Sequence, residues 1–118
     1  IVLSAPNNFQ VLSQKVKKMA LHYVEMSYRT NKILSAAALI KELDLIITPD
    51  TSIVHIASTF NKPIVSIHEN NKYSYELFAP TSKLSRTVFS NSKNSLDGFS
   101  IDLLLKFGFE LINLIKKG

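Results

Sequence analysis

The feature that most constrains the fold is a short apolar run that ends in a polar turn and passes into a helical pattern. The run, Leu45–Ile47, is bounded by Asp44 and Pro49, as is typical of a fully buried parallel strand. Asp50 and Thr51 both favour the N-cap position, so a helix is expected to begin at one of them. A helix that follows a parallel strand presents free backbone N–H groups and the positive end of its dipole together. The turn therefore predicts an anion-binding site.

The helix after the turn has two faces of different character. The apolar stripe expected to pack on the sheet consists of Ile53, Ile56, Ala57 and Phe60. Thr51 and His55 lie four residues apart on roughly the opposite face, and His55 should lean back toward the turn because helical side chains tilt toward the N-terminus. The side chains that could converge on one ligand are Asp50, Thr51, Ser52 and His55. Plain roles stay open: a helix cap for Asp50 or Thr51, and an exposed surface position for His55.

Composition limits the class of protein. The chain has 118 residues, of which 46% are hydrophobic, enough for one domain with a real core. It has no cysteine, which excludes disulfides and thiolate metal sites, and no apolar run approaches the roughly 18 residues of a membrane span. The net charge of +5 indicates either solvated helix surfaces or a patch attracted to the phosphates of a ligand or a membrane. No motif supports binding of nucleic acid.

Apolar runs and helical patterns alternate along the chain. Strands are expected at Ile1–Leu3, Leu21–Met26, Leu45–Thr48, Ile64–His68 and Leu84–Phe89, and helices at Phe9–Ala20, Ile33–Leu43, Thr51–Phe60 and Phe99–Lys117. Glu69–Lys83 and Ser90–Gly98 are polar and are expected to be loops. The core face of the last helix is expected to contain Ile101, Leu104, Leu105, Phe109, Ile112 and Ile115. This alternation predicts an α/β fold: a Rossmann-like, three-layer parallel sheet with helices on both faces.

Ligands of such folds bind beyond the carboxyl ends of the strands. The turns at that edge contain Tyr28, Arg29, Thr30, Asp50, Thr51, Glu69 and Lys72. The plainer interpretation of Arg29, Glu69 and Lys72 is a solvated loop position, and that of Tyr73, Tyr75 and Phe78 is local packing. His22 and His68 lack metal-ligand spacing with any carboxylate, so they are expected to be structural, and no metal site is predicted.

The segment from Asp50 to Pro63 resembles the signature of the heptosyltransferase family, glycosyltransferase family nine. That signature is an apolar strand, Asp-Thr-Gly, two residues, His, an apolar–Ala pair, and a later Pro that opens the next apolar strand. This chain has Asp50-Thr51-Ser52-Ile53-Val54-His55-Ile56-Ala57, then Pro63. Ser52 stands where the family usually has Gly; serine keeps the backbone N–H but adds a side chain, so the donor sugar can differ from the usual one.

The resemblance implies a GT-B enzyme, in which two Rossmann-like domains face each other across a cleft. The carboxyl-terminal domain, which this chain resembles, binds the nucleotide-diphospho-sugar donor, typically ADP-heptose. The amino-terminal domain holds the acceptor, lipid A with its inner core sugars, and the catalytic base. Residues 1–118 would thus be a single donor-binding domain, a carboxyl-terminal fragment without a catalytic residue and inactive alone.

By motif match, the residues contacting the donor diphosphate and sugar would be Asp50, Thr51, Ser52 and His55; Arg29, Thr30, Glu69 and Lys72 are added from the rim. No cofactor is implied. The enzyme is expected to act in lipopolysaccharide biosynthesis in the cytoplasm, with peripheral association with the inner membrane left open.

Two other classes of protein have a similar order of strands and helices. A receiver-like phosphoacceptor domain needs an acidic pair after its first strand, and Ser4-Ala5-Pro6 supplies no acid. A non-catalytic nucleotide-binding or scaffolding α/β module stays open as an alternative.

Overall fold

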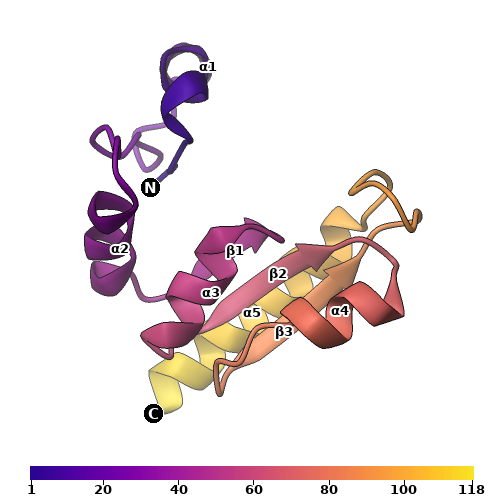
Figure 1. Cartoon of the computed structure of the whole chain (residues 1–118). Helices are drawn as coiled ribbons and strands as arrows, with labels where there is room; N and C mark the ends of the chain where they lie inside the picture. Colours follow the sequence, from indigo (N-terminus) through magenta and orange to yellow (C-terminus); the bar gives the residue numbers. More distant parts are fainter. The chain divides into compact units, whose positions relative to one another are not determined.

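The computed structural model describes every residue from Ile1 to Gly118. The chain forms two compact units, residues 1–39 and residues 40–118, and helix α2 (Ile33–Glu42) leads from the first into the second (Figure 1). The expectation of a single domain over 1–118 stays a prediction, and the units are described separately below.

The first unit contains a 3-10 turn, η1 (Pro6–Asn8), helix α1 (Phe9–Met19) and the beginning of α2. The expected strands at Ile1–Leu3 and Leu21–Met26 are wrong, because one isolated parallel bridge between Val2 and Met26 takes their place. Ala20 adopts a left-handed conformation with φ of 53° as it ends α1. The amide of Val24 then donates to the carbonyl of Leu21 across 3.1 Å. A turn therefore uses backbone groups that a strand would have needed.

The second unit is built on a parallel sheet of 3 strands in the order β1-β2-β3. The strands are β1 (Ile46–Pro49), β2 (Ile64–His68) and β3 (Ser85–Phe89). Ile46 pairs with Ile64, and Ile64 pairs with Ser85. Consecutive strands that are parallel and neighbouring require a crossover between them, and helices α3 (Ser52–Thr59) and α4 (Lys72–Phe78) supply it. The α/β class and the parallel sheet are confirmed.

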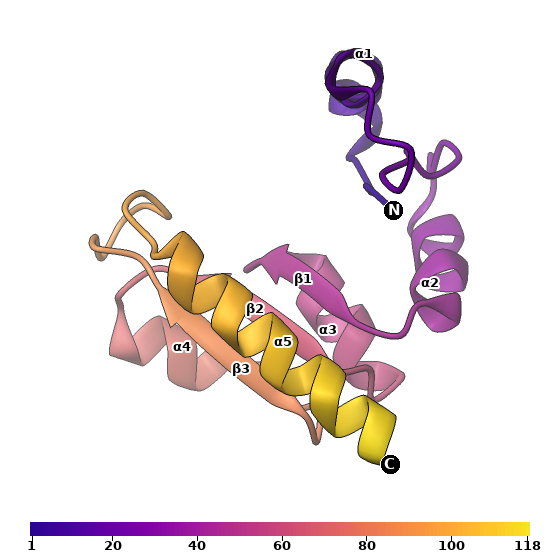
Figure 2. The same cartoon turned by 180° about the vertical axis from the view of Figure 1, so that it is seen from behind.

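Helices cover both faces of this sheet. Figures 1 and 2 show α3 and α4 on one face and α5 (Ile101–Lys117) on the other. The core beneath α5 centres on Val65, Val88 and Leu111. Because side chains alternate along a strand, Val65 toward α5 puts Ile64, Ser66 and His68 on the face of α3 and α4. All five residues of β2 are buried.

Several expected local features differ from the structure. The expected loop at Glu69–Lys83 contains α4, which begins because the Asn71 side chain accepts from the amide of Ser74 across 3.2 Å. On α5, Leu104, Ile112 and Ile115 of the expected core face are half-buried, whereas Ile101, Leu105 and Phe109 are exposed. The fully buried residues are Gly108 and Leu111. On α3, Ala57 is buried as expected, but Val54 is buried as well and Phe60 is exposed. In both helices apolar residues cover a broad face. The part of that face that packs against the sheet is rotated about the helix axis relative to the expected one.

Candidate functional site

The turn between β1 and α3 is fixed by its backbone. The amide of Asp50 donates to the carbonyl of Ile67 across 2.8 Å, which extends the ladder between β1 and β2 by one residue. Thr51 is then extended, with φ of −139° and ψ of −179°, and its hydroxyl accepts from the amide of Ile53 across 3.2 Å. Thr51 is thus the N-cap of α3 and Ser52 its first residue. This confirms the strand–turn–helix expected from the sequence.

The amides of Thr51 and Ser52 donate to no other group of the chain. Both residues are exposed, and the Thr51 hydroxyl keeps its own hydrogen free because it only accepts from Ile53. These donors lie at the positive end of the α3 dipole and at the carboxyl edge of a parallel sheet. Such an arrangement favours an anionic ligand, above all a phosphate group.

The Asp50 carboxylate lies against His68, the last residue of β2. The distance from Asp50 Oδ2 to His68 Nδ1 is 3.5 Å, and the side chains are 29% and 2% exposed, respectively. The carboxylate therefore stands at the rim with the imidazole buried behind it. From the sequence, His68 was expected to have a structural role only. The signal that could have found the contact is strand pairing: Pro49 pairs with Ile67, so the next residues of both strands are neighbours.

A buried polar network continues from His68 into the sheet. His68 Nε2 lies 2.9 Å from the Ser66 hydroxyl, which is 3.5 Å from the hydroxyl of Thr87 on β3. The Tyr75 hydroxyl of α4 lies 2.9 Å from the same Thr87 oxygen. The Tyr75 ring packs edge-on against His68, with centroids 5.1 Å apart. This network, Asp50–His68–Ser66–Thr87–Tyr75, links the rim to the inner face of α4.

Burial lowers the pKa of His68, because the charged imidazolium loses its hydration. The neighbouring Asp50 raises the pKa and His55 lowers it further, but the effect of burial is the largest. His68 is therefore neutral at pH 7, and its contact with Asp50 is that of a neutral ring with a carboxylate.

The other expected site residues of the second unit lie around this edge. His55 is exposed, and its ring meets that of Phe78 edge-on at 6.3 Å. Glu69 directly follows β2 and is half-buried, and Lys72 is the exposed first residue of α4. The amide of Asn70 donates to the carbonyl of Ser92 across 2.8 Å, which joins the loops after β2 and β3. Whether these side chains contact a ligand stays a prediction.

Arg29 and Thr30 belong to the first unit. The Arg29 guanidinium lies 4.6 Å from the centroid of the Phe9 ring, a cation–π contact, and Thr30 is buried. Their part in ligand binding also stays a prediction.

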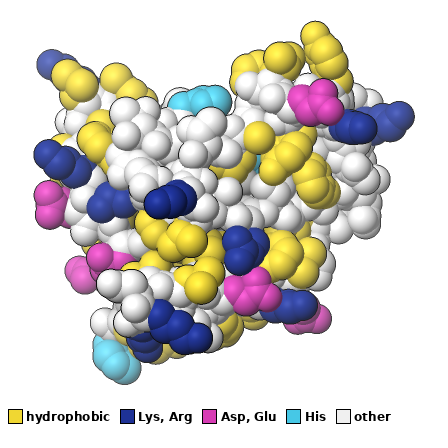
Figure 3. Space-filling view, turned by 90° about the horizontal axis from the view of Figure 1, so that it is seen from below, with side chains coloured by type: hydrophobic (Ala, Val, Ile, Leu, Met, Phe, Trp, Pro, Cys, Tyr) yellow, Lys and Arg dark blue, Asp and Glu magenta, His cyan; other side chains and the backbone are white.

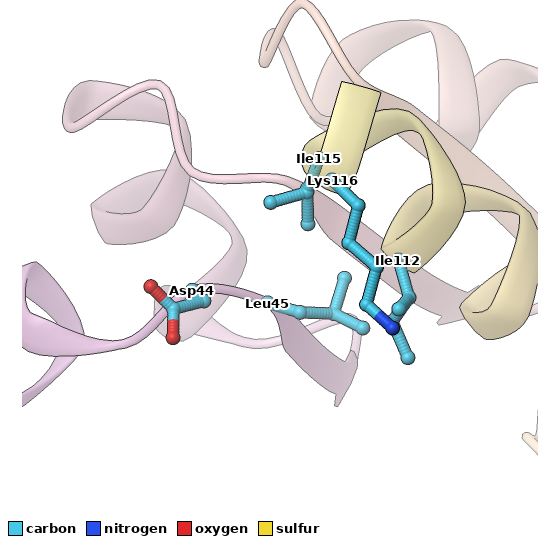
Figure 4. A pocket seen from close by; sticks show the side chains of 5 residues that line it. All are labelled: Asp44, Leu45, Ile112, Ile115 and Lys116. Carbon is cyan, nitrogen blue, oxygen red and sulfur yellow. The ribbon is translucent and has the colours of Figure 1, made fainter. Parts of the chain in front are cut away.

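A pocket of about 330 Å³ lies elsewhere in the second unit. Its lining residues are Asp44, Leu45, Ile112, Ile115 and Lys116, and Figure 4 shows the Leu45 side chain pointing toward Ile112 and Lys116. These residues lie at the amino end of β1 and the carboxyl end of α5, so the pocket is at the opposite end of β1 from Asp50. Its walls are mostly apolar, which suits a hydrocarbon group better than a phosphate.

Three further observations concern the whole chain. No group of three or more His, Asp or Glu side chains is placed to hold a metal ion. None of the helices combines the length and the apolar content that crossing a bilayer requires. Figure 3 shows basic, acidic and hydrophobic side chains interspersed, with no large patch of one charge.

Comparison with known families agrees with the geometry of the turn. The family model described as glycosyltransferase family 9 (heptosyltransferase) matches residues 3–101. The chain belongs to glycosyltransferase family 9. The match covers the β1–α3 turn, all three strands and α4, and it ends where α5 begins. Neither a curated protein nor a solved structure matches the chain. Membership of family 9 confirms the resemblance seen in Asp50–Pro63 and indicates that the reaction is glycosyl transfer.

Proposed function

We propose that this chain binds a nucleotide-diphospho-sugar donor, ADP-heptose foremost, at the amino end of α3, for transfer of the sugar to the lipopolysaccharide core. The observation that carries the proposal is the pair of amides, those of Thr51 and Ser52, which have no partner within the chain. The family description as heptosyltransferase supports the choice of sugar. The acceptor would be lipid A with its core sugars, held by a second domain at the inner membrane surface.

Catalysis in this proposal is electrostatic. Negative charge grows on the diphosphate as the bond to the sugar breaks, and donors aimed at that charge lower the barrier. The amides of Thr51 and Ser52 and the hydroxyl of Thr51 are such donors, and they are already held in place by the end of β1. Removing one donor of this kind typically costs on the order of 3 kcal/mol of barrier.

The charge of each side chain determines which part of the donor it would contact. Asp50 is an anion, so it is suited to accept hydrogen bonds from sugar hydroxyls and unsuited to touch phosphate. His55 follows the turn by one helical turn and can donate to a phosphate oxygen. Glu69 and Lys72, of the second unit, would complete the site, with Lys72 at the phosphates and Glu69 at sugar or ribose hydroxyls.

Ser52 permits a direct test of the amides. Proline is favoured at the first position of a helix and lacks the N–H group, and the extended Thr51 is compatible with a following proline. Ser52→Pro should therefore keep the fold and remove one proposed donor. Ser52→Ala, the matched control, keeps the N–H and loses only the hydroxyl.

Calorimetric titration of ADP-heptose, ADP and UDP-sugars would measure the effect. We expect the unsubstituted chain and Ser52→Ala to bind ADP-heptose with similar affinity. Ser52→Pro should bind about 10- to 100-fold more weakly, the usual value of a hydrogen bond to a charged group, with an unchanged melting temperature. Equal binding by both variants would reject the amide cradle. Binding of no nucleotide sugar by the unsubstituted chain would favour the alternative, a scaffolding or non-catalytic nucleotide-binding module.

A further inference from the structure

We propose that His68 is a positioning residue: through Nδ1 it holds the Asp50 carboxylate against the sheet, aimed at the sugar of the donor and away from the amides that bind the diphosphate. The inference rests on the proposed function, since it assigns the sugar to Asp50. It concerns a residue outside the Asp50–His55 segment, on the neighbouring strand.

Asp50 needs such a restraint because of its place in the chain. It lies directly before the N-cap Thr51, within reach of the positive end of the α3 dipole. A free carboxylate at this position is attracted to unpaired amides at a helix N-terminus. If Asp50 turned to the amides of Thr51 and Ser52, it would compete with a phosphate for them. The contact with His68 keeps Oδ2 on the side of β2.

The network behind His68 fixes which way each hydrogen points. An ionised carboxylate only accepts, so the single N–H of the neutral imidazole belongs on Nδ1, toward Asp50. Nε2 then accepts from the Ser66 hydroxyl at 2.9 Å. Ser66 accepts in turn from Thr87, and Thr87 from Tyr75. Every donor in the network therefore points toward Asp50, and the direction is set by the carboxylate at its end.

The sheet makes this network rigid. Thr48, Ser66 and Thr87 are register partners across all three strands, and Ser66 is fully buried. The His68 carbonyl accepts from the amide of Ser90 across 2.9 Å, and the Tyr75 ring is held between His68 and Phe89, 4.9 Å from the latter. The imidazole can rotate only by breaking buried hydrogen bonds, which is costly.

Substitutions at His68 separate positioning from packing. His68→Phe keeps an aromatic ring of similar size and removes both nitrogens. His68→Asn places a side-chain N–H close to the position of Nδ1, and His68→Gln places its polar atoms close to Nε2. Positioning through Nδ1 thus predicts rescue by Asn and not by Gln.

Calorimetry with ADP-heptose and with ADP, which lacks the heptose, provides the readout. We expect His68→Phe and His68→Gln to weaken ADP-heptose binding about 10-fold while ADP affinity stays within about twofold, because only the sugar contact is lost. His68→Asn should stay within about threefold of the unsubstituted chain for both ligands. Parallel losses for both ligands, or equal affinities in all variants, would overturn the positioning role while leaving the donor site standing.

The orientation of the ring can be checked without any ligand. Imidazole nitrogen shifts in an NMR spectrum of the labelled chain should show the proton of His68 on Nδ1, and Asp50→Ala should move it to Nε2 or leave a mixture. A proton on Nε2 in the unsubstituted chain would overturn the proposal. This result is independent of whether ADP-heptose binds, so failure of the inference and failure of the proposed function are distinguishable.

Discussion

Asp50 and His68 form a contact whose chemistry depends on their different exposure. The Asp50 side chain is 29% exposed and is accessible to solvent or a ligand, whereas that of His68 is 2% exposed and is not. A buried imidazole is kept neutral, and a neutral imidazole donates one hydrogen in one direction. The buried imidazole of His68 is therefore an oriented hydrogen-bond donor, and the carboxylate of Asp50 is its acceptor. Substitutions at each residue can test this contact separately.

The lowered pKa of His68 predicts a pH dependence of stability. In the unfolded chain the imidazole has a pKa of about 6.5, so below that pH the unfolded state binds more protons than the native state. The free energy of unfolding should therefore fall as the pH is lowered from 7 through this range. The titratable groups that face the ring are Asp50, which raises its pKa, His55, which lowers it, and Tyr75.

Urea unfolding at several pH values between about 5 and 7.5 would measure this dependence. His68→Phe should show a shallower slope of unfolding free energy against pH than the unsubstituted chain. Tyr75→Phe, which keeps His68, should keep the steeper slope. Identical slopes in His68→Phe and the unsubstituted chain would contradict the prediction.

Asp50 and His55 are expected to matter for transfer rather than for folding. Under the proposed function, Asp50→Ala or His55→Ala should lower the rate of sugar transfer about 10- to 100-fold, since each would remove a hydrogen bond to a polar or charged group of the donor. Steady-state kinetics with the nucleotide sugar would measure the loss. Asp44→Ala is the matched control, because Asp44 is exposed and lies at the amino end of β1, opposite the proposed site. Wild-type turnover in Asp50→Ala or His55→Ala would reject the assignment of that residue.

Helix α5 illustrates how packing selects one face of an apolar helix. Apolar residues occur on more than one side of it, and Ile101, Leu105 and Phe109 remain exposed. The helix instead buries Gly108 and Leu111, which brings its backbone close to β1 at Ile47. A glycine within a helix costs about 0.5–1 kcal/mol relative to alanine, so its presence here is a local weakness that substitution can probe.

Gly108→Ala should raise the free energy of unfolding by about 0.5–1 kcal/mol. A Cβ at Gly108 would lie 3.8 Å from Ile47 Cδ1, an ordinary van der Waals distance, so the gain in helix propensity comes without a clash. Urea unfolding of the two chains would measure the difference. Destabilisation by Gly108→Ala would contradict the prediction and would show that the added methyl group does not fit between α5 and Ile47.

Gly98→Ala is the matched control, and the opposite result is expected. Gly98 has φ of +76°, and a Cβ there would clash with the side-chain amide of Asn91. Alanine in a left-handed conformation costs about 1–2 kcal/mol, and the Asn91 side chain would also have to move. The same Gly→Ala change should therefore stabilise in α5 and destabilise in the loop before it.

At the scale of the whole molecule, polar and apolar features of the second unit lie at opposite ends of β1. The free amides and the Asp50–His68 pair lie beyond the carboxyl ends of the strands, and the apolar pocket lies at the amino end of β1. This arrangement is common to parallel sheets, because the carboxyl ends of the strands and the N-termini of the following helices lie at the same edge. The net charge of +5 adds a weak overall attraction for phosphates, which salt would screen.

The sequence alone was sufficient for the strand–turn–helix at Leu45–Ala57, the parallel α/β class and the family. Each of these follows from local information: an apolar run, an N-cap hydroxyl at Thr51, and the spacing from Asp50 to His55. The register of β2 and β3 with β1 was decided only by the tertiary structure, and with it the contact of His68 with Asp50.

The same distinction explains the expectations that failed. The strand at Leu21–Met26 had an apolar pattern but found no continuous partner, and a strand without a ladder is not formed. The core face of α5 depended on which stripe fitted the sheet. The sequence pattern of a segment determines which of its residues can be buried and which can cap a helix. Which polar groups meet is determined by the pairing of distant segments, because hydrogen bonds and packing require particular partners in space.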